Sequence, residues 1–147
     1  MKYLMFSLKE RKYLIEIDKV NSIVKKNRED IRSLPEAPSW ILGLSNLRQK
    51  IILMIDLRKR LRLPATITEE FYVVMVRSED DIAGMVVDEV NGVISINEEL
   101  KKPNTIIDVE YIKGILLKDD DIYILIDPDK IFDFDIKQFT QIKETVI

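Results

Sequence analysis

Residues 43–58, GLSNLRQKIILMIDLR, carry the strongest indication of the fold in this sequence. A polar interruption at residues 46–48, Asn-Leu-Arg, separates two apolar runs that each have the length of a β-strand. The pattern predicts a hairpin with strands at 40–47 and 50–56, the second apolar enough to be buried on both faces. Because Asn-Gly would close such a hairpin with less strain, the arginine at its tip needs a further explanation.

β-Rich runs continue on both sides of this hairpin. The sequence predicts further strands at residues 2–8, 12–18, 19–26, 71–77, 81–90, 92–96, 109–118 and 121–127. About ten short strands joined by polar turns favour a sandwich or a barrel, because closure protects the strand edges. Two blocks of roughly five strands suggest two small barrels with a shared apolar seam, although no sequence repeat supports this division.

The segments without strand character complete the expected organisation. A short helix is predicted after Asp56 and ends near Pro64. The polar connector at 64–70 is the expected crossing between the two halves, and the tail at 128–147 is expected to form helical turns packed on the barrels. A chain of 147 residues suffices for one ordinary domain or two very small units that share a core, so we expect a single domain over residues 1–147.

The composition excludes several classes of chemistry. The formal net charge is −3, so no basic field attracts nucleic acid or anionic lipid. Histidine and cysteine are absent, which removes the Ser-His triad, thiolate nucleophiles and the commonest transition-metal ligands. No glycine-rich phosphate loop occurs, and no apolar run approaches the roughly 20 residues that span a bilayer. We expect a cytoplasmic protein without cofactor, metal ion, nucleic-acid partner or direct membrane insertion.

Charged clusters leave other interpretations open. The acidic clusters at 79–81 and 119–121 could attract a cation, but solvated hairpin turns are the commoner use of such carboxylates. The basic run at 58–62 could contact nucleic acid, although a solvated helix face or an electrostatic rim for a protein partner is favoured. A small β-barrel enzyme or ligand-binding barrel could use Asp56 or Asp88. Burial at the end of its strand would raise the pKa of Asp56, but the simpler interpretation is that Asp56 caps the following helix.

Three residues of the central hairpin invite both a structural and a functional interpretation. Trp40, the single tryptophan, is expected to be a core residue before it is an interface residue. Gly43 lies inside a strand pattern, which favours a bulge or a close backbone approach in a barrel wall. Arg48 can make forked contacts with a carboxylate, either of this chain or of a partner, and composition favours neither source.

The central hairpin resembles the signature of the CheW-like domain family, the coupling proteins of bacterial chemotaxis. That signature contains Gly-hydrophobic-x-Asn-Leu-Arg-Gly, then an apolar strand with a proline, then Asp-Leu-Arg. The matching residues here are Gly43, Asn46, Leu47, Arg48, Asp56, Leu57 and Arg58. The flanking stretches LPEAPSWILGL, GMVVDEVNGV and YIKGILLKDDDIYILIDPDKIF resemble the family as well, so the resemblance covers nearly the whole chain.

The resemblance implies an all-β fold of two intertwined five-stranded SH3-like barrels and a non-catalytic adaptor. Family members bridge the regulatory domain of a chemotaxis histidine kinase and the cytoplasmic tip of a chemoreceptor, which are therefore the expected partners. The residues expected to contribute to receptor or kinase contact are Val20, Ile23, Gly43, Asn46 and Arg48. Val20 would add apolar area, Gly43 would let a partner helix approach and Arg48 would orient it, while Gly43 and Asn46 could instead mainly shape the hairpin.

Two residues depart from the family signature. Gln49 stands where the family usually has glycine, which permits positive φ, so this change could reshape the tip beside Arg48. Leu53 stands where the family usually has proline, and it restores a backbone donor in the following strand. Both departures leave room for an adaptor of a related signalling system, such as surface motility or another kinase pathway.

Overall fold

Ten strands in two five-stranded sheets make up most of the computed structural model, which describes residues 1–64, 68–78, 81–102 and 110–132. The strands are β1 (Lys2–Leu8), β2 (Arg11–Glu16), β3 (Val20–Asn27), β4 (Ile41–Leu47), β5 (Lys50–Asp56), β6 (Glu70–Ser78), β7 (Asp81–Val87), β8 (Glu89–Ser95), β9 (Ile112–Lys118) and β10 (Asp121–Ile126). The helices are the 3-10 turns η1 (Ile17–Lys19) and η2 (Arg28–Asp30) and the single α-turns α1 (Leu57–Arg60) and α2 (Pro128–Ile131). The predicted all-β class with two five-stranded units is confirmed.

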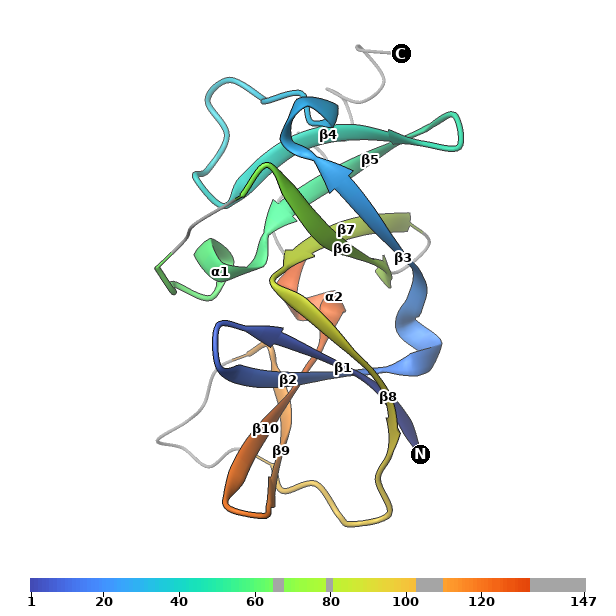
Figure 1. Cartoon of the computed structure of the whole chain (residues 1–147), viewed down its shortest axis with the longest axis vertical. Coiled ribbons are helices and arrows are strands. Elements are labelled where there is room, and N and C mark those ends of the chain that lie inside the picture. Colours follow the sequence, from blue (N-terminus) through green and yellow to red (C-terminus); the bar gives the residue numbers. More distant parts are fainter. Residues whose placement is uncertain (65–67, 79–80, 103–109, 133–147) are drawn as a thin grey trace.

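Each sheet combines strands from both parts of the chain. Sheet A has the order β8-β1-β2-β10-β9, and sheet B has the order β3-β6-β7-β5-β4. Figure 1 shows sheet B in the upper half of the molecule and sheet A in the lower half. Sheet A thus contains the hairpin β1–β2 together with β8, β9 and β10 from the later part of the chain. Sheet B contains the hairpin β6–β7 together with β3, β4 and β5 from the earlier part.

The structure contradicts the predicted crossing at residues 64–70. The strands on either side of this segment, β5 and β6, both belong to sheet B. The chain passes from one sheet to the other at η1, between β2 and β3, and at Asp88, between β7 and β8. The run 81–90, predicted as one strand, is therefore divided. A change of sheet can take place at one residue while strand-forming side chains continue on both sides, so side-chain alternation does not reveal it.

The later part of the chain repeats the earlier part around the hairpins β4–β5 and β9–β10. Gly43 and Asp56 in the first hairpin correspond to Gly114 and Asp127 in the second, each pair 71 positions apart. Each aspartate accepts a hydrogen bond from a backbone N–H of the short helix that follows, at 3.4 Å for Asp56 and 3.0 Å for Asp127. The strand orders of the two sheets are equivalent as well. The molecule consists of two similar halves that have exchanged their first hairpins.

In each sheet an isolated bridge connects the two edges. In sheet B, Arg32 follows the edge strand β3 and exchanges two backbone hydrogen bonds of 2.8 Å with Leu44 of the opposite edge strand β4. In sheet A, Lys101 follows β8 and exchanges bonds of 2.7 and 2.9 Å with Ile115 of β9. These bridges satisfy backbone groups that a sheet edge would otherwise expose.

The described residues form four apolar core clusters: one between the sheets, one within each sheet, and a smaller one of Ile41, Leu44 and Leu53 on the hairpin β4–β5. The cluster between the sheets includes Leu4, Phe6 and Ile15 of sheet A with Ile55, Val74 and Met85 of sheet B. Sheet B encloses a second cluster around Met54, Val73 and Met75, and sheet A a third around Tyr3, Leu14 and Leu125. Both faces of the central strands are therefore buried, and the shared seam supports the expectation of a single domain.

Part of the predicted helical tail lies within the described residues. α2 follows β10 directly and packs against β6 of the other sheet. Its Pro128 and Ile131 are buried, as is Phe132 after it. The rest of the predicted tail, residues 133–147, lies outside the described residues. No helix in the described ranges has the length and apolar character needed to cross a bilayer.

Candidate protein-interaction site

The tip of the β4–β5 hairpin is a two-residue turn formed by Arg48 and Gln49. Both residues have positive φ, 50° and 69°, as in a type I′ turn, whose twist matches that of the flanking strands. The Asn46 side-chain oxygen accepts a hydrogen bond from the Gln49 backbone N–H at 3.0 Å. Gln49 thus adopts the positive φ that glycine would adopt more readily, and Asn46 has the hairpin-shaping role that was one of its two interpretations.

Arg48 projects from this tip into solvent. Its side chain is exposed, and it forms no ion pair with any other residue that the structure describes. Asp119 and Asp120 occupy the same turn positions in the β9–β10 hairpin, with φ of 53° and 63°. The two hairpin tips therefore carry opposite charges. Among the described residues no carboxylate pairs with Arg48, so its guanidinium group is accessible at the tip.

Gly43 is buried below the tip, where the chain itself occupies the space beside it. Its φ is 144°, and a Cβ built there would lie 2.1 Å from the Arg32 carbonyl oxygen. The pairing of β4 with β5 shifts register between Ile41 and Gly43, as the predicted bulge requires. The close approach that Gly43 permits is made by residue 32 of this chain rather than by a partner helix.

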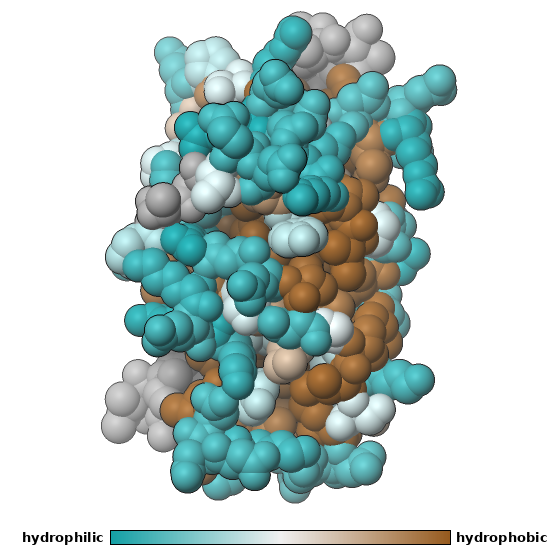
Figure 2. All heavy atoms as spheres, viewed as in Figure 1, coloured by the Kyte–Doolittle hydropathy of each residue, from teal (hydrophilic) through white to brown (hydrophobic). Residues whose placement is uncertain are grey.

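Val20 and Ile23 lie on β3, the edge strand opposite β4 in sheet B. Val20 is half-buried and packs against the core between the sheets, whereas the Ile23 side chain is 42% exposed. Val93 on β8, the edge strand of sheet A, is 54% exposed. Figure 2 shows apolar side chains gathered in a band on this side of the molecule, over β3 and β8, with hydrophilic side chains covering most of the remaining face. Ile23 thus belongs to an exposed apolar band.

The two parts of the candidate site meet through the end of β3. The Lys26 ammonium group donates a hydrogen bond to the Asn46 carbonyl oxygen at 2.8 Å. An open groove of about 510 Å³ lies beside the tip, lined by Asn46, Gln49, Leu44 and Ile51 among others. The structure brings Asn46 and Arg48 together at the tip, whereas Val20 and Ile23 lie on β3, the opposite edge strand of sheet B.

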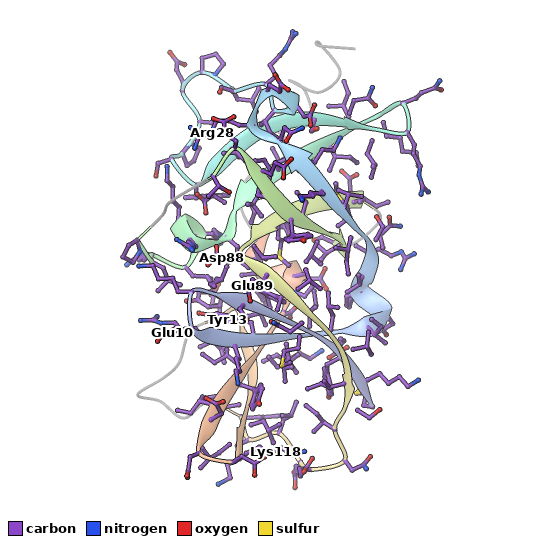
Figure 3. The ribbon with its side chains drawn as sticks, viewed as in Figure 1. Glu10, Tyr13, Arg28, Asp88, Glu89 and Lys118 are labelled. Atoms are coloured by element: carbon purple, nitrogen blue, oxygen red, sulfur yellow. The ribbon has the colours of Figure 1, made fainter. Side chains whose placement is uncertain are left out.

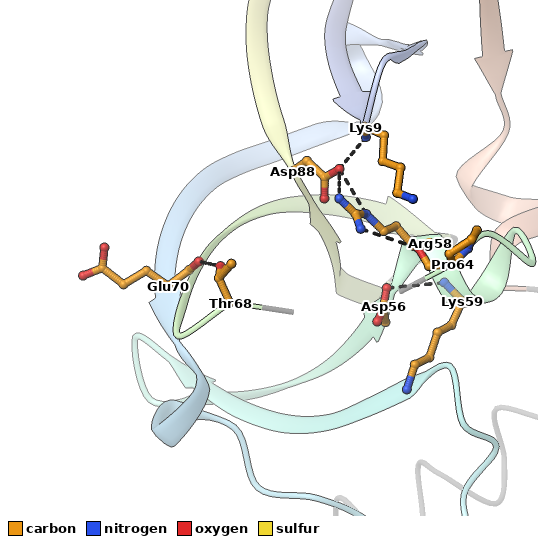
Figure 4. A network of polar contacts seen from close by, with 8 residues as sticks. All are labelled: Lys9, Asp56, Arg58, Lys59, Pro64, Thr68, Glu70 and Asp88. Atoms are coloured by element: carbon orange, nitrogen blue, oxygen red, sulfur yellow. Dashed lines mark hydrogen bonds and ion pairs between the residues drawn. The ribbon is translucent and has the colours of Figure 1, made fainter. Parts of the chain in front are cut away.

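Asp56 combines both structural roles that the sequence suggested for it. The side chain is 2% exposed, and one of its oxygens accepts the Lys59 backbone N–H at the start of α1 (Figure 4). Its other oxygen, Oδ2, is buried without a hydrogen-bond partner among the described residues. Burial raises the pKa of the Asp56 carboxyl above its ordinary value, and the hydrogen bond from Lys59 opposes this effect.

Asp88 lies where the chain passes from sheet B to sheet A. Figure 3 shows Asp88 and Glu89 at the passage between the sheets, beside the β1–β2 hairpin that carries Glu10 and Tyr13. The Asp88 carboxylate forms an ion pair with Arg58 of α1 and also accepts the Lys9 backbone N–H (Figure 4). Both groups that could have served a β-barrel enzyme, Asp56 and Asp88, thus have structural partners.

The sequence did not predict the roles of Arg58 and Arg60 in the basic run. Arg58 pairs with Asp88, while Arg60 donates to the Ile131 carbonyl oxygen at 2.8 Å and stacks over Trp40, 4.8 Å from its ring centre. Trp40 itself packs against two core clusters, as expected. A run of arginines after a buried strand gave no signal of these contacts, because their partners come from distant parts of the chain.

The described residues form a small mainly-β domain with an exposed arginine at a hairpin tip and an exposed apolar band, which are features of a protein-interaction module. Within the described ranges, no group of three or more potential metal ligands occurs. The chain belongs to the CheW-like domain family, which matches residues 2–135.

Individual relatives and a solved structure agree with this membership. The chain is 34% identical over 136 residues to Chemotaxis protein CheW of Treponema pallidum, which covers 86% of this chain and 79% of that protein. It is 36% identical over 98 residues to Chemotaxis protein CheW of Bacillus subtilis, which covers 66% of this chain and 62% of that protein. The crystal structure of the scaffolding protein TtCheW from Thermoanaerobacter tengcongensis is similar with a TM-score of 0.79 and 36% identity, over 91% of this chain and 93% of that one.

Proposed function

We propose that this chain is a non-catalytic, cytoplasmic chemotaxis adaptor that couples chemoreceptors to a histidine kinase. Its partners are the regulatory domain of the kinase and the cytoplasmic tip of a receptor. The adaptor performs no chemistry, and it holds two proteins so that the state of one biases the other. The contact residues we propose are Val20, Ile23, Asn46 and Arg48, with Gly43 acting through the shape of the hairpin.

The membership in the CheW-like family over residues 2–135 is the observation that carries this proposal. The exposed guanidinium of Arg48 supports it, because a charged group that pairs with no described residue can give direction and specificity to a modest interface. The apolar band with Ile23 and Val93 supports it as well, since such a surface favours association.

The test is calorimetric titration of the purified chain with the regulatory domain of the chemotaxis kinase from the same source. We expect saturable one-to-one binding, and we expect Arg48→Ala to weaken it by about tenfold, the loss typical of one good charged contact. Asp119→Ala is the matched control, because Asp119 occupies the same turn position in the other hairpin. This control should bind as the parent does.

The outcomes separate the proposal from its alternatives. Retained kinase binding by a folded Arg48→Ala chain would indicate that Arg48 contacts the receptor instead. The same titration with a receptor tip would test this. Absence of binding by the folded parent chain to both partners would refute the proposal and favour a scaffold of another kinase pathway.

A further inference from the structure

An ion pair lies at each of the two places where the chain passes from one sheet to the other. In each pair, one residue comes from the short helix that follows β5 or β10. At the first passage, Lys19 of η1 pairs with Asp129 of α2 at 3.4 Å. At the second passage, Asp88 pairs with Arg58 of α1. Arg58 and Asp129 are 71 positions apart, the spacing of the internal repeat, so they are equivalent residues of opposite charge. Their partners, Lys19 and Asp88, are not equivalent positions, but both lie at a passage between the sheets, so the two contacts are similar in place and opposite in polarity.

The contact at Asp88 connects three elements. One carboxylate oxygen of Asp88 accepts from two nitrogens of Arg58, of which Nε lies at 3.0 Å, and from the Lys9 backbone N–H (Figure 4). Lys9 lies in the turn between β1 and β2 of sheet A, whereas Arg58 lies in the helix that follows β5 of sheet B. The Asp88 backbone N–H also donates to the Ser7 carbonyl oxygen at 3.1 Å. Asp88 is thus bound to both sheets at once.

The two ion pairs differ in burial, and this difference indicates which of them is stronger. The side chains of Arg58 and Asp88 are 13% and 24% exposed, and those of Lys19 and Asp129 are 34% and 39% exposed. Partly desolvated ion pairs with several charge-assisted hydrogen bonds are stronger and more directional than exposed single contacts. The Arg58–Asp88 pair is therefore the dominant contact, and the Lys19–Asp129 pair is a weaker counterpart at the other passage.

Directional contacts are needed here because the seam between the sheets is apolar. Hydrophobic contacts resist separation of the sheets, but they are non-directional and permit small sliding motions of packed layers. We propose that the two ion pairs form a joint that fixes the rotation of sheet A relative to sheet B, with Arg58 and Asp88 as its main positioning residues. Arg60 adds a third connection across the seam through its bond to Ile131 in α2.

A distance measurement tests the joint without any partner protein. The chain has no cysteine, so spin labels can be placed at Lys50→Cys in sheet B and Leu117→Cys in sheet A, both exposed. Electron–electron double resonance then gives the distribution of label separations. We expect Arg58→Gln combined with Lys19→Gln to widen this distribution about twofold, as sheets released to slide should do. Lys19→Gln alone should also widen the distribution. The variant with reversed charges, Lys19→Asp combined with Asp129→Lys, should have the width of the parent distribution.

Lys25→Gln is the matched control, because the Lys25–Glu70 pair, at 3.1 Å, joins β3 and β6 within one sheet. Its distribution should equal that of the parent. Equal widths in all folded variants would overturn the proposal. If the Arg58 variant does not fold, the Lys19 variants decide alone, since both members of that pair are about one-third exposed and tolerate substitution.

The consequence for signalling rests on the proposed function. With a fixed rotation, a partner on one sheet can influence a partner on the other, so the joint variant should bind each partner alone normally but lose their mutual effect on affinity. Preserved coupling in a variant with a widened distribution would contradict this step. If the parent bound neither partner, the adaptor proposal would fail while the distance measurement would still decide the joint.

Discussion

At the scale of single residues, Asp56 has two roles with opposite requirements. Capping α1 favours an ionised carboxylate at the helix start, whereas burial disfavours the charge. Desolvation dominates, so the pKa of Asp56 in the folded chain is raised above 3.8. The folded chain therefore holds the Asp56 proton more tightly than the unfolded chain does. The stability from this difference is fully present below pH 3.8 and is lost as the pH rises through the raised pKa.

Asp56→Asn should remove this dependence on pH while retaining the cap, because asparagine caps helices as well as aspartate does. We expect the free energy of unfolding of the variant, relative to the parent, to increase as the pH rises from about 3.5 to about 8. Urea unfolding across this range measures it. Asp127→Asn, at the equivalent cap, controls for the loss of a capping carboxylate, and a difference that did not change with pH would contradict the expectation.

Ile23 gives a second prediction at this scale. Ile23→Glu places a charge in the apolar band, and we expect it to weaken binding of the receptor tip or the kinase domain by about tenfold. Because Ile23 is 42% exposed, the free energy of unfolding should change by less than about 1 kcal/mol. Leu117→Glu, at a position 68% exposed on β9, is the control. Unchanged binding of both partners by Ile23→Glu would show that Ile23 is not a contact residue.

At the scale of elements, the β4–β5 turn determines how Arg48 is presented. Arg48 and Gln49 both hold positive φ, which costs an L-residue about 1 kcal/mol that glycine avoids. Gln49→Gly should therefore raise the free energy of unfolding by about 0.5–1 kcal/mol, measured in urea, with Gln49→Ala as the control that keeps the strain. A loss of stability in the glycine variant would mean that the Gln49 side chain stabilises the turn.

The remaining elements differ in how far sequence patterns could predict them. The hairpin β4–β5 and its cap at Asp56 followed from two apolar runs, a polar turn and an aspartate before a basic run, all of which are local signals. The division of the run 81–90 at Asp88 could not be predicted from local signals. Both parts of the run favour extended backbone, and they differ only in the sheet to which each part belongs. The same limit applies to the crossing that was expected at 64–70.

At the scale of the whole molecule, the exchange of hairpins makes each half depend on the other. The hairpin β1–β2 lies between β8 and β10, and β6–β7 lies between β3 and β5. We expect the fragment of residues 1–66 to be unfolded alone, because an isolated hairpin and an incomplete sheet are not stable in water. Mixing it with the fragment 67–147 should restore amide dispersion in NMR spectra. A cooperative unfolding transition of the first fragment alone would contradict this.

The fold class, the strands around the central hairpin and the candidate residues from Val20 to Arg48 could be predicted from the amino-acid sequence, since these depend on local pattern and on a family signature. Only the folded chain shows which strands share a sheet, where the chain passes between sheets, and that Arg58 pairs with Asp88 while Arg48 remains exposed. The physical reason is the range of the interactions. Turns, caps and strand alternation are fixed by near neighbours, whereas sheet membership and ion pairing between residues 30 positions apart depend on the packing of the whole chain.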